Sequence, residues 1–380
     1  MDKINTIIIR GGSSKGLFLS IEDLPPAGEE RNATILRLFG SPDLRQIDGL
    51  GGADKLTSKV ALIGPPSRDD CDISYHFGQV GTDKPTIDWS SNCGNISAGV
   101  ALYAAYKGVG KYHDSNYLIN IEQVNTGRVL KARVPMNGTI PEKSGDYVIG
   151  GVPGSGPRID LDFYDFAGSC FGGGLFPTGC RRDYFYIPSL GNIELTVLDM
   201  ANFHIFVRAK DLKITNINSV LELQNDKKLI SVLEEIRKIV SIELGFVDLE
   251  HSERYLQISV NPLVHIIDLP SKVKLLNGKF LYPENMDLIG LSFSRGIFSK
   301  AFPGTGAIGT AVACSIRGTI PSELQQSENS GSGIMDWIIC HPGGLLTVTT
   351  ELVNNSGIIA IRKALLGRTA RLLMSGAAFL

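Results

Sequence analysis

The segment SSNCGNISAGVALYAAY, residues 90–106, is a run of small and apolar residues that opens with one cysteine between an asparagine and a glycine. A run that is apolar on every side is typical of a helix enclosed by other elements. A second run of this kind, TGAIGTAVA at residues 305–313, aligns with CGNISAGVA at residues 93–101. The aligned runs are identical at Gly94/Gly306, Ile96/Ile308, Val100/Val312 and Ala101/Ala313. The sequence therefore predicts two enclosed helices of common pattern.

The spacing of these two runs indicates a duplicated chain. Their first residues, at positions 93 and 305, are 212 residues apart in a chain of 380, about the half-length that an internal duplication requires. Single hydrophobic cores usually stop growing at about 250–300 residues, so two domains are expected. Short β-type runs such as TIIIR, KVALIG, IELTVLD and FHIFVRA recur through both halves. We predict a β-rich α/β protein with two pseudo-equivalent lobes, each a curved sheet around one central helix, whose N-termini face one cleft.

Other segments carry weaker structural signals. Residues 219–241 have apolar side chains at helical spacing and a charged opposite face, which predicts an amphipathic surface helix. We also expect helices near residues 30–40 and 360–368. The polar run SELQQSENSGSG, near residues 322–333, is typical of an exposed loop.

Composition narrows the class of partner. The chain has 37 basic and 39 acidic residues, so no large charge excess attracts a nucleic acid or an anionic membrane. No apolar run approaches the roughly 18 residues of a membrane helix, and we expect a soluble, cytoplasmic protein. The six cysteines form no C-x-x-C pair and the histidines do not cluster, which argues against a zinc site or a disulfide framework. A small-molecule partner is therefore expected.

Cys93 is the first candidate for chemistry. A helix N-terminus presents unpaired N–H groups and a partial positive charge, which hold a carboxylate and favour the thiolate of a cysteine. We interpret Cys93 as a proton donor or acceptor, because Asn92, Gly94 and Asn95 beside it are poor core residues and good anion-nest residues. The alternative is a small buried cysteine that only fills space, which is the commoner role of cysteine.

Lys59 is the second candidate, and the sequence leaves its role open. It stands after the turn-like run GGADKLTS and at the start of the apolar strand VALIG. Its ammonium group could extend to the surface, as most lysines in such positions do. A desolvated lysine would instead lose its proton more easily and could act as a base.

Two further turns have the composition of anion-binding loops. RGGSSKG, residues 10–16, lacks the spacing of a Walker loop, and is either an ordinary turn or a nest that offers the Ser13 and Ser14 hydroxyls. CHPGG, residues 340–344, is either a plain turn or a carboxylate clamp made of His341, Gly343 and Gly344. Several anion-binding sites together would suit a substrate with more than one carboxylate.

These residues lie in motifs that resemble the 2-methylaconitate cis-trans isomerase family, whose members resemble diaminopimelate epimerase in fold. The resemblance covers nearly the whole chain. Its motifs, in order, are RGGSSKGLFL, DGLGGADKLTSKVALI, DWSSNCGNISAGVALYA, VPGSGPRIDLDF, GLFPTG, HPGG and RTARLLMSG.

The resemblance implies an α/β (α+β) fold of two pseudo-symmetric lobes, each a β-barrel-like sheet around a central helix. We place the lobes at residues 1–185, with about 370–380 added, and at 186–369. It also implies an active site without cofactor or metal, in which Lys59 and Cys93 are the catalytic pair. The expected substrate-binding residues are Ser13, Ser14, Asn92, Gly94, Asn95, Thr305, Gly306, His341, Gly343 and Gly344.

The chain departs from related patterns at informative positions. Epimerases of this fold use a second cysteine at the other helix start, where this chain has Thr305, so amino-acid racemisation is disfavoured. The family's usual HPSG is HPGG here, and its SGNCGN is SSNCGN. Both changes bear on which arrangement of carboxylates is accepted.

The main hypothesis is therefore a cofactor-independent cis-trans isomerase of aconitate or 2-methylaconitate, with a homodimer as one option for its assembly. The second is an allylic isomerase or tautomerase of methylitaconate or 4-oxalomesaconate. A third hypothesis, of another class, is a non-catalytic accessory or binding protein that uses the same cleft. A nucleotide-binding enzyme ranks below these, because neither phosphate-loop pattern is complete.

Overall fold

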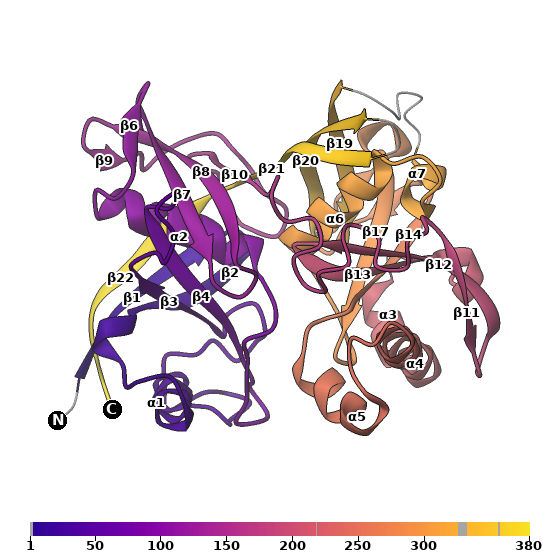
Figure 1. The fold of residues 1–380 in the computed structure, drawn as a ribbon, viewed down its shortest axis with the longest axis horizontal. Helices are drawn as coiled ribbons and strands as arrows, with labels where there is room; N and C mark the ends of the chain where they lie inside the picture. Colours follow the sequence, from indigo (N-terminus) through magenta and orange to yellow (C-terminus); the bar gives the residue numbers. More distant parts are fainter. Residues whose placement is uncertain (1–2, 218, 326–332, 356–357) are drawn as a thin grey trace. The chain divides into compact units, whose positions relative to one another are not determined.

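The computed structural model describes residues 3–217, 219–325, 333–355 and 358–380. The chain forms two compact units (Figure 1): Met1–Asp162 with Gly367–Leu380, and Phe163–Leu366. The lobe boundary expected at residue 185 falls inside the second unit. The reason is that strand β11 (Asp183–Ile187) pairs with strand β12 (Gly191–Met200) of that unit.

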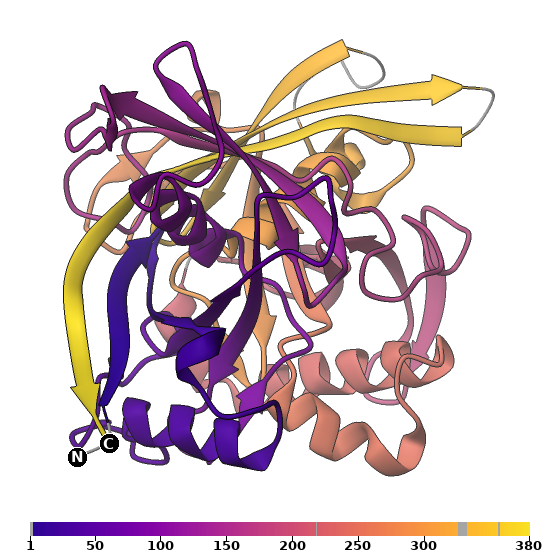
Figure 2. The same ribbon diagram turned by 60° about the vertical axis from the view of Figure 1, so that its left-hand side comes forward.

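The first unit is built on one curved sheet. Its long strands follow one another, by hydrogen-bonded neighbours, as β22 (Ala370–Phe379), β1 (Lys3–Gly11), β2 (Ser14–Ser20), β3 (Lys59–Gly64), β4 (Ile73–Val80), β7 (Asn116–Gln123), β8 (Arg128–Asn137) and β10 (Ile159–Asp162). Figure 2 shows β22 and β1 side by side near the two chain termini. Three short strands pair antiparallel with long ones: β5 (Ile87–Asp88) with β4, β6 (Lys111–His113) with β7, and β9 (Ile140–Pro141) with β8. The helices are η1 (Ile21–Asp23), α1 (Glu29–Phe39) and α2 (Gly94–Tyr106).

The second unit also contains a series of paired long strands. Its long strands follow one another as β11, β12, β13 (Asn202–Arg208), β14 (Leu263–Asp268), β17 (Leu288–Ser294), β19 (Gly333–His341), β20 (Gly344–Asn355) and β21 (Ile358–Arg368). The remaining strands are β15 (Val273–Lys274), β16 (Phe280–Leu281) and β18 (Ile297–Phe298). The helices are η2 (Ala209–Leu212), α3 (Val220–Asn225), α4 (Lys227–Glu243), α5 (Leu249–Ile258), η3 (Pro283–Asn285), α6 (Gly304–Cys314) and α7 (Ile320–Leu324).

The two sheets repeat one pairing pattern. Read from β22 to β10, neighbouring strands are antiparallel, antiparallel, parallel, antiparallel, parallel, antiparallel and antiparallel. The same series runs from β11 to β21. Helix α2 precedes β7 just as α6 precedes β19 at the equivalent place. This repeat supports the internal duplication that the aligned helix sequences predict.

The two central helices are enclosed, as their composition predicts. Every residue of α6 is buried, and in α2 only Tyr103 and Tyr106 are not. Strands approach α2 so closely that side chains would not fit: a Cβ on Gly11 would lie 2.2 Å from the Asn95 carbonyl oxygen, and one on Gly99 would lie 2.4 Å from the Phe18 ring. The short distance between α2 and the strands around it therefore requires glycine at these contacts.

Two predictions of helices need correction. Residues 219–241 form two helices, α3 and α4, because Asp226 ends the first and caps the second by accepting the Leu229 N–H at 3.0 Å. Residues 360–368 are wrong as a helix: they belong to β21, which pairs antiparallel with β20. Of the expected loop at 322–333, the first residues form part of α7 and residues 326–332 lie outside the described chain.

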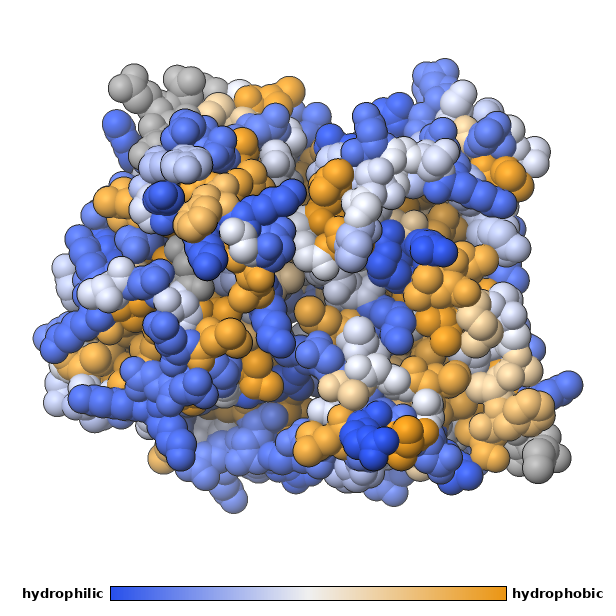
Figure 3. Space-filling view, turned by 180° about the vertical axis from the view of Figure 1, so that it is seen from behind, coloured by the Kyte–Doolittle hydropathy of each residue, from blue (hydrophilic) through white to orange (hydrophobic). Residues whose placement is uncertain are grey.

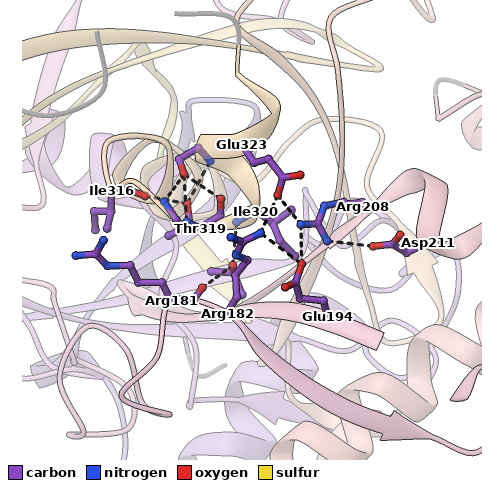
Figure 4. Close-up of polar contacts among 12 residues, drawn as sticks. Arg181, Arg182, Glu194, Arg208, Asp211, Ile316, Thr319, Ile320 and Glu323 are labelled. Carbon is purple, nitrogen blue, oxygen red and sulfur yellow. Dashed lines mark hydrogen bonds and ion pairs between the residues drawn. The ribbon is translucent and has the colours of Figure 1, made fainter. Parts of the chain in front are cut away.

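An ion-pair cluster attaches α7 to the second sheet (Figure 4). Arg208 on β13 binds Glu194 of β12 at 2.7 Å, and also pairs with Asp211 and with Glu323 of α7. Arg182 reaches the same two glutamates. Because these charged groups pair with one another within the second unit, we interpret the cluster as a structural contact that holds α7 against β12 and β13.

The surface shows no single apolar face in the view of Figure 3, where hydrophobic and hydrophilic residues are intermixed. Individual large apolar side chains are exposed, among them Ile47, Tyr184 and Leu44. No helix in the described ranges is long and apolar enough to cross a membrane.

Close contact between β1 and α2 gives a stability prediction. We expect Gly11→Ala to lower the free energy of unfolding by about 1–3 kcal/mol, because the new methyl meets backbone atoms that have no side-chain freedom to yield. Gly376→Ala on β22 is the control, since its Cβ would lie 3.4 Å from the nearest atom, the Met374 sulfur. Urea denaturation followed by circular dichroism measures both, and equal stability of the two variants would contradict the packing account.

Candidate active site

Cys93 is held at the N-terminus of α2 by a buried polar network. It is the N-cap residue, with extended backbone (φ −139°, ψ 99°), and is 8% exposed. The Asn92 Oδ1 atom accepts the Cys93 N–H at 2.6 Å and the Tyr75 hydroxyl at 3.1 Å. The Cys93 carbonyl accepts the Ser97 N–H and hydroxyl, each at 3.0 Å. Burial raises the pKa of Tyr75, so it is a neutral donor. The backbone of the cysteine is thus fixed from both sides.

The first turn of α2 also contacts the RGGSSKG segment. Gly11 and Ser14 pair across the tight turn between β1 and β2, and Gly12 has a φ of +52°. The Asn95 side-chain amide donates to the hydroxyl oxygens of Ser13 and Ser14, at 3.1 and 3.4 Å. A Cβ on Gly12 would lie 2.0 Å from Asn95 Oδ1, so glycine is required there for both space and backbone angle. The segment is therefore a turn, placed against a helix N-terminus.

Lys59 points inward. It is the first residue of β3 and is 7% exposed. Its Nζ donates to Gln79 Oε1 at 2.6 Å and lies 5.1 Å from the centre of the Phe77 ring. The Gln79 amide nitrogen donates to the carbonyls of Lys55 and Ser58, both at 3.0 Å, which turns its oxygen toward the lysine. The ammonium group therefore does not extend to the surface.

Lys59 and Cys93 belong to the same side of the first sheet. Tyr75, Phe77 and Gln79 alternate along β4 and so share one face of it. Lys59 contacts Gln79 at one end of this row, and Tyr75 at the other end contacts the network around Cys93. One row of side chains thus links the two candidates within one unit.

Arg368 is a site residue that the sequence analysis missed. It is 3% exposed, and its Nε donates to Asn95 Oδ1 at 2.9 Å. Burial lowers the pKa of Arg368 to about 10, while the negative charges of Tyr147 and Cys93, when ionised, act to raise it. At neutral pH the guanidinium therefore carries its charge beside the first turn of α2. It lies in the RTARLLMSG motif, but composition and periodicity do not show which arginine of that motif is buried.

The second unit holds the other predicted helix start. Thr305 lies in the first turn of α6 and accepts the Asn202 amide N–H at 2.7 Å. Asn202 begins β13, whose turn from β12 is the topological equivalent of the turn carrying Ser13 and Ser14. Gly306 packs against a buried histidine, and a Cβ there would lie 2.8 Å from His265 Cε1.

The HPGG segment is a tight turn between β19 and β20. His341 pairs with Gly344 across it, and the Gly343 N–H donates to His341 Nδ1 at 3.0 Å. His341 is buried, and its ring stacks with Phe302 at a centroid distance of 6.4 Å. The turn is thus observed, and its use as a carboxylate clamp stays a prediction.

The predicted site residues therefore form two groups. The first unit holds Lys59, Cys93, Ser13, Ser14, Asn92, Gly94 and Asn95. The second unit holds Thr305, Gly306, His341, Gly343 and Gly344.

A buried histidine pair beneath α6 was not predicted from the sequence. His204 Nδ1 and His265 Nε2 lie 2.9 Å apart, within hydrogen-bond distance. Burial lowers the pKa of His204 to about 4, so it is neutral. In the described ranges, no group of three or more His, Cys, Asp or Glu is placed to hold a metal ion.

Comparison with known proteins establishes the family. The family model described as PrpF protein matches residues 1–380, and the chain belongs to this family. It is 36% identical to the 3-methylitaconate isomerase of Eubacterium barkeri, covering 98% of this chain and 96% of that protein. It is 35% identical to the 4-oxalomesaconate tautomerase of Pseudomonas putida (98% and 95%) and 31% identical to the 2-methyl-aconitate isomerase of Shewanella oneidensis (98% and 96%).

Solved structures confirm the fold. The crystal structure of a methylitaconate-delta-isomerase matches with a TM-score of 0.80 at 35% identity, covering 100% of this chain and 96% of that one. A hydroxyproline epimerase from Agrobacterium vitis matches with a TM-score of 0.57 at 13% identity, covering 99% and 92%. The second likeness concerns the fold alone, and it confirms the expected α/β fold of the epimerase type.

The cysteines differ in a way that alkylation can test. Burial raises the pKa of Cys340 to about 12, and those of Cys170 and Cys314 well above the ordinary range, so all three are thiols at pH 8. We expect iodoacetamide to modify the exposed Cys180 of the folded protein and to leave the buried Cys314 and Cys340 unmodified until urea is added. Mass spectrometry of peptides measures this, and labelling of Cys314 as fast as Cys180 in the folded protein would contradict the structure.

Proposed function

We propose that this protein is an isomerase of unsaturated di- or tricarboxylates that transfers a proton at a carbon allylic to a C=C bond. The observation that carries the proposal is the placement of Lys59 and Cys93 on one side of one sheet, with Cys93 at the N-terminus of an enclosed helix. The isomerase and tautomerase names of full-length relatives support the reaction class.

The chemistry assigns one proton-transfer step to each residue. Lys59, as the neutral amine, removes a proton from the allylic carbon, and the electron pair spreads over the C=C bond and a carboxylate as a dienolate. The Cys93 thiol then gives a proton to the carbon skeleton. The Lys59 ammonium releases the proton it took and the Cys93 thiolate takes one up, through exchange with solvent, so both residues end the cycle as they began. The Gly94 and Asn95 N–H groups in the first turn of α2 stabilise negative charge on the carboxylate. The Lys59 amine donates to Gln79 Oε1 at 2.6 Å, which holds it on the α2 side of the sheet.

The first substrate candidate is aconitate or 2-methylaconitate, with cis-trans isomerisation. When a proton leaves the methylene group, the former C=C bond becomes part of a dienolate. Its double-bond character falls, so rotation about that bond is easier. Cys93 then delivers a proton to the carbon that lost one. The 31% identity to a 2-methyl-aconitate isomerase over nearly the full chain supports this candidate.

The second candidate is methylitaconate or 4-oxalomesaconate, with migration of the double bond. The same dienolate is protonated at the other end of the allylic system. Identities of 36% and 35% to relatives named for these reactions favour it. The same lysine and cysteine serve both candidates, so substrate identity depends on how carboxylates are held. A non-catalytic binding protein has no need of this pair, which places that hypothesis third.

Replacing the pair tests the reaction. We expect Lys59→Ala and Cys93→Ser each to reduce kcat on the accepted substrate by about 10²–10⁴-fold, the usual contribution of a general acid or base. Lys107→Ala and Cys180→Ser, at exposed positions, should retain wild-type activity. The assay is loss or gain of ultraviolet absorbance with each of the four candidate substrates. Full activity of either site variant would refute its proton-transfer role, and failure of the wild type on all four would favour the binding-protein hypothesis.

A charge change beside Lys59 tests its role as the base. In Gln79→Glu a carboxylate replaces the amide that accepts the Lys59 ammonium at 2.6 Å. Because an adjacent opposite charge favours the charged lysine, we expect the rising limb of kcat/KM to move to higher pH by about 1–3 units. Gln79→Leu, which adds no charge, should lower activity without that shift. An unmoved pH profile in Gln79→Glu would show that Lys59 is not the base.

A further inference from the structure

Arg368 carries a buried charge for which the described chain supplies no counter-ion. Its hydrogen-bond partners in the described chain are neutral: Nε donates to Asn95 Oδ1, and Nη1 donates to the Gly367 carbonyl at 3.0 Å. Two other buried arginines each pair with glutamate, Arg208 with Glu194 and Arg237 with Glu234. Buried charges are normally paired, because desolvation is costly. Within the described ranges, no carboxylate forms an ion pair with Arg368 and its Nη2 atom donates to no acceptor, which points to an anion from outside the protein.

The orientation of Asn95 adds two more donors at the same place. An arginine Nε can only donate, so the Asn95 atom that it contacts is the oxygen, and the Asn95 nitrogen faces Ser13 and Ser14. Both serine oxygens therefore accept from Asn95, and each keeps its own O–H for another partner. Among the described residues neither serine hydroxyl donates a hydrogen bond. Arg368 thus sets the direction of Asn95, and Asn95 leaves both hydroxyls free to donate.

The backbone holds these groups in place without a ligand. The Gly12 N–H donates to the Thr369 carbonyl at 2.8 Å. Arg10 Nη1 donates to the carbonyl of Gly12 at 2.8 Å and to the Thr369 side chain at 3.0 Å. The β1–β2 turn and the segment after β21 are therefore fastened together beside the first turn of α2. A site whose donors are fixed in advance binds without paying the full cost of ordering them.

From this arrangement we propose that Arg368 is a specificity-determining residue that binds one carboxylate of the substrate, with Ser13 and Ser14 donating to the same group and Asn95 as the positioning residue. The inference rests on the proposed function for the identity of the ligand. A guanidinium presents two parallel N–H donors that match the two oxygens of a carboxylate. The subsite adjoins Cys93, two residues before Asn95 on the helix, so it holds the substrate at the cysteine.

Calorimetric titration with tricarballylate, the saturated analogue of aconitate, tests this binding separately from turnover. We expect Arg368→Gln to weaken tricarballylate binding by about 10- to 150-fold, the range for lost hydrogen bonds to a charged group. Arg368→Lys, which keeps the charge and loses the fork, should fall between Arg368→Gln and wild type. Arg362→Gln, on the same strand but exposed, is the matched control and should bind as wild type does.

A second variant tests the same subsite without replacing a buried arginine, so its result does not depend on whether the Arg368 variants fold. Ser13→Ala combined with Ser14→Ala leaves Arg368 in place and should weaken binding by about 10-fold through loss of the two hydroxyl donors. On an accepted substrate, the Arg368 variants should raise KM more than they lower kcat. Inorganic phosphate serves as the competing anion and should not displace tricarballylate at equal concentration.

The outcomes separate this inference from the proposed reaction. Wild-type affinity in folded Arg368→Gln, or in the double serine variant, would overturn the carboxylate subsite even if isomerase activity stands. Undetectable binding of tricarballylate by the wild type, or Arg368-dependent binding of phosphate at equal strength, would overturn it as well. Arg368-dependent binding of polycarboxylates without any isomerisation would support the subsite and contradict the proposed reaction.

Discussion

The enclosure of helix α2 by the first sheet is the constraint on which the candidate site depends. The sheet reaches the helix so closely that glycine is needed at Gly11, Gly12 and Gly99, where a Cβ would overlap Asn95 or Phe18. The same closeness brings the β1–β2 turn against the first helical turn. As a result the free N–H groups of a helix N-terminus, which elsewhere face water, lie in a buried setting where they act more strongly on an anion. The residues that do chemistry are positioned by a packing requirement of the core.

The polar groups around this helix start are arranged to favour a negatively charged ligand. Arg368 is buried, and its hydrogen bonds within the described chain are to neutral groups, Asn95 and Gly367. Lys59 is also buried and donates to Gln79. The ion-pair cluster around Arg208 in the second unit shows the other arrangement, in which a buried arginine pairs with Glu194 and with the exposed Glu323, and so holds α7 to the sheet. A polycarboxylate would supply at the first site what the glutamates supply at the second.

Much of the fold could be predicted from the sequence, because an enclosed helix has a distinctive composition. The two apolar runs, their alignment and their half-chain spacing predicted an internal duplication. The repeated order of strand pairings in the two units supports it. Local signals failed where tertiary context decides: residues 360–368 become a strand because they pair with β20, and Asp226 divides a continuous amphipathic pattern by capping α4. Cys93 and the serine turn could be chosen from their residue types and motif positions. Arg368 and the His204–His265 pair could not, since nothing in a single sequence shows which arginine or histidine is buried and against what. The roles of the chosen residues stay predictions.

The most direct test of the account is proton NMR of the wild-type protein in D2O with each candidate polycarboxylate. Proton transfer through exchangeable groups on Lys59 and Cys93 predicts that isomerisation places solvent deuterium on the carbon skeleton: in the methylene group for aconitate, or at the new methyl group for methylitaconate. Isomerisation over many turnovers with every substrate hydrogen retained would contradict the account, because it would mean that the double bond changes without exchange through these side chains.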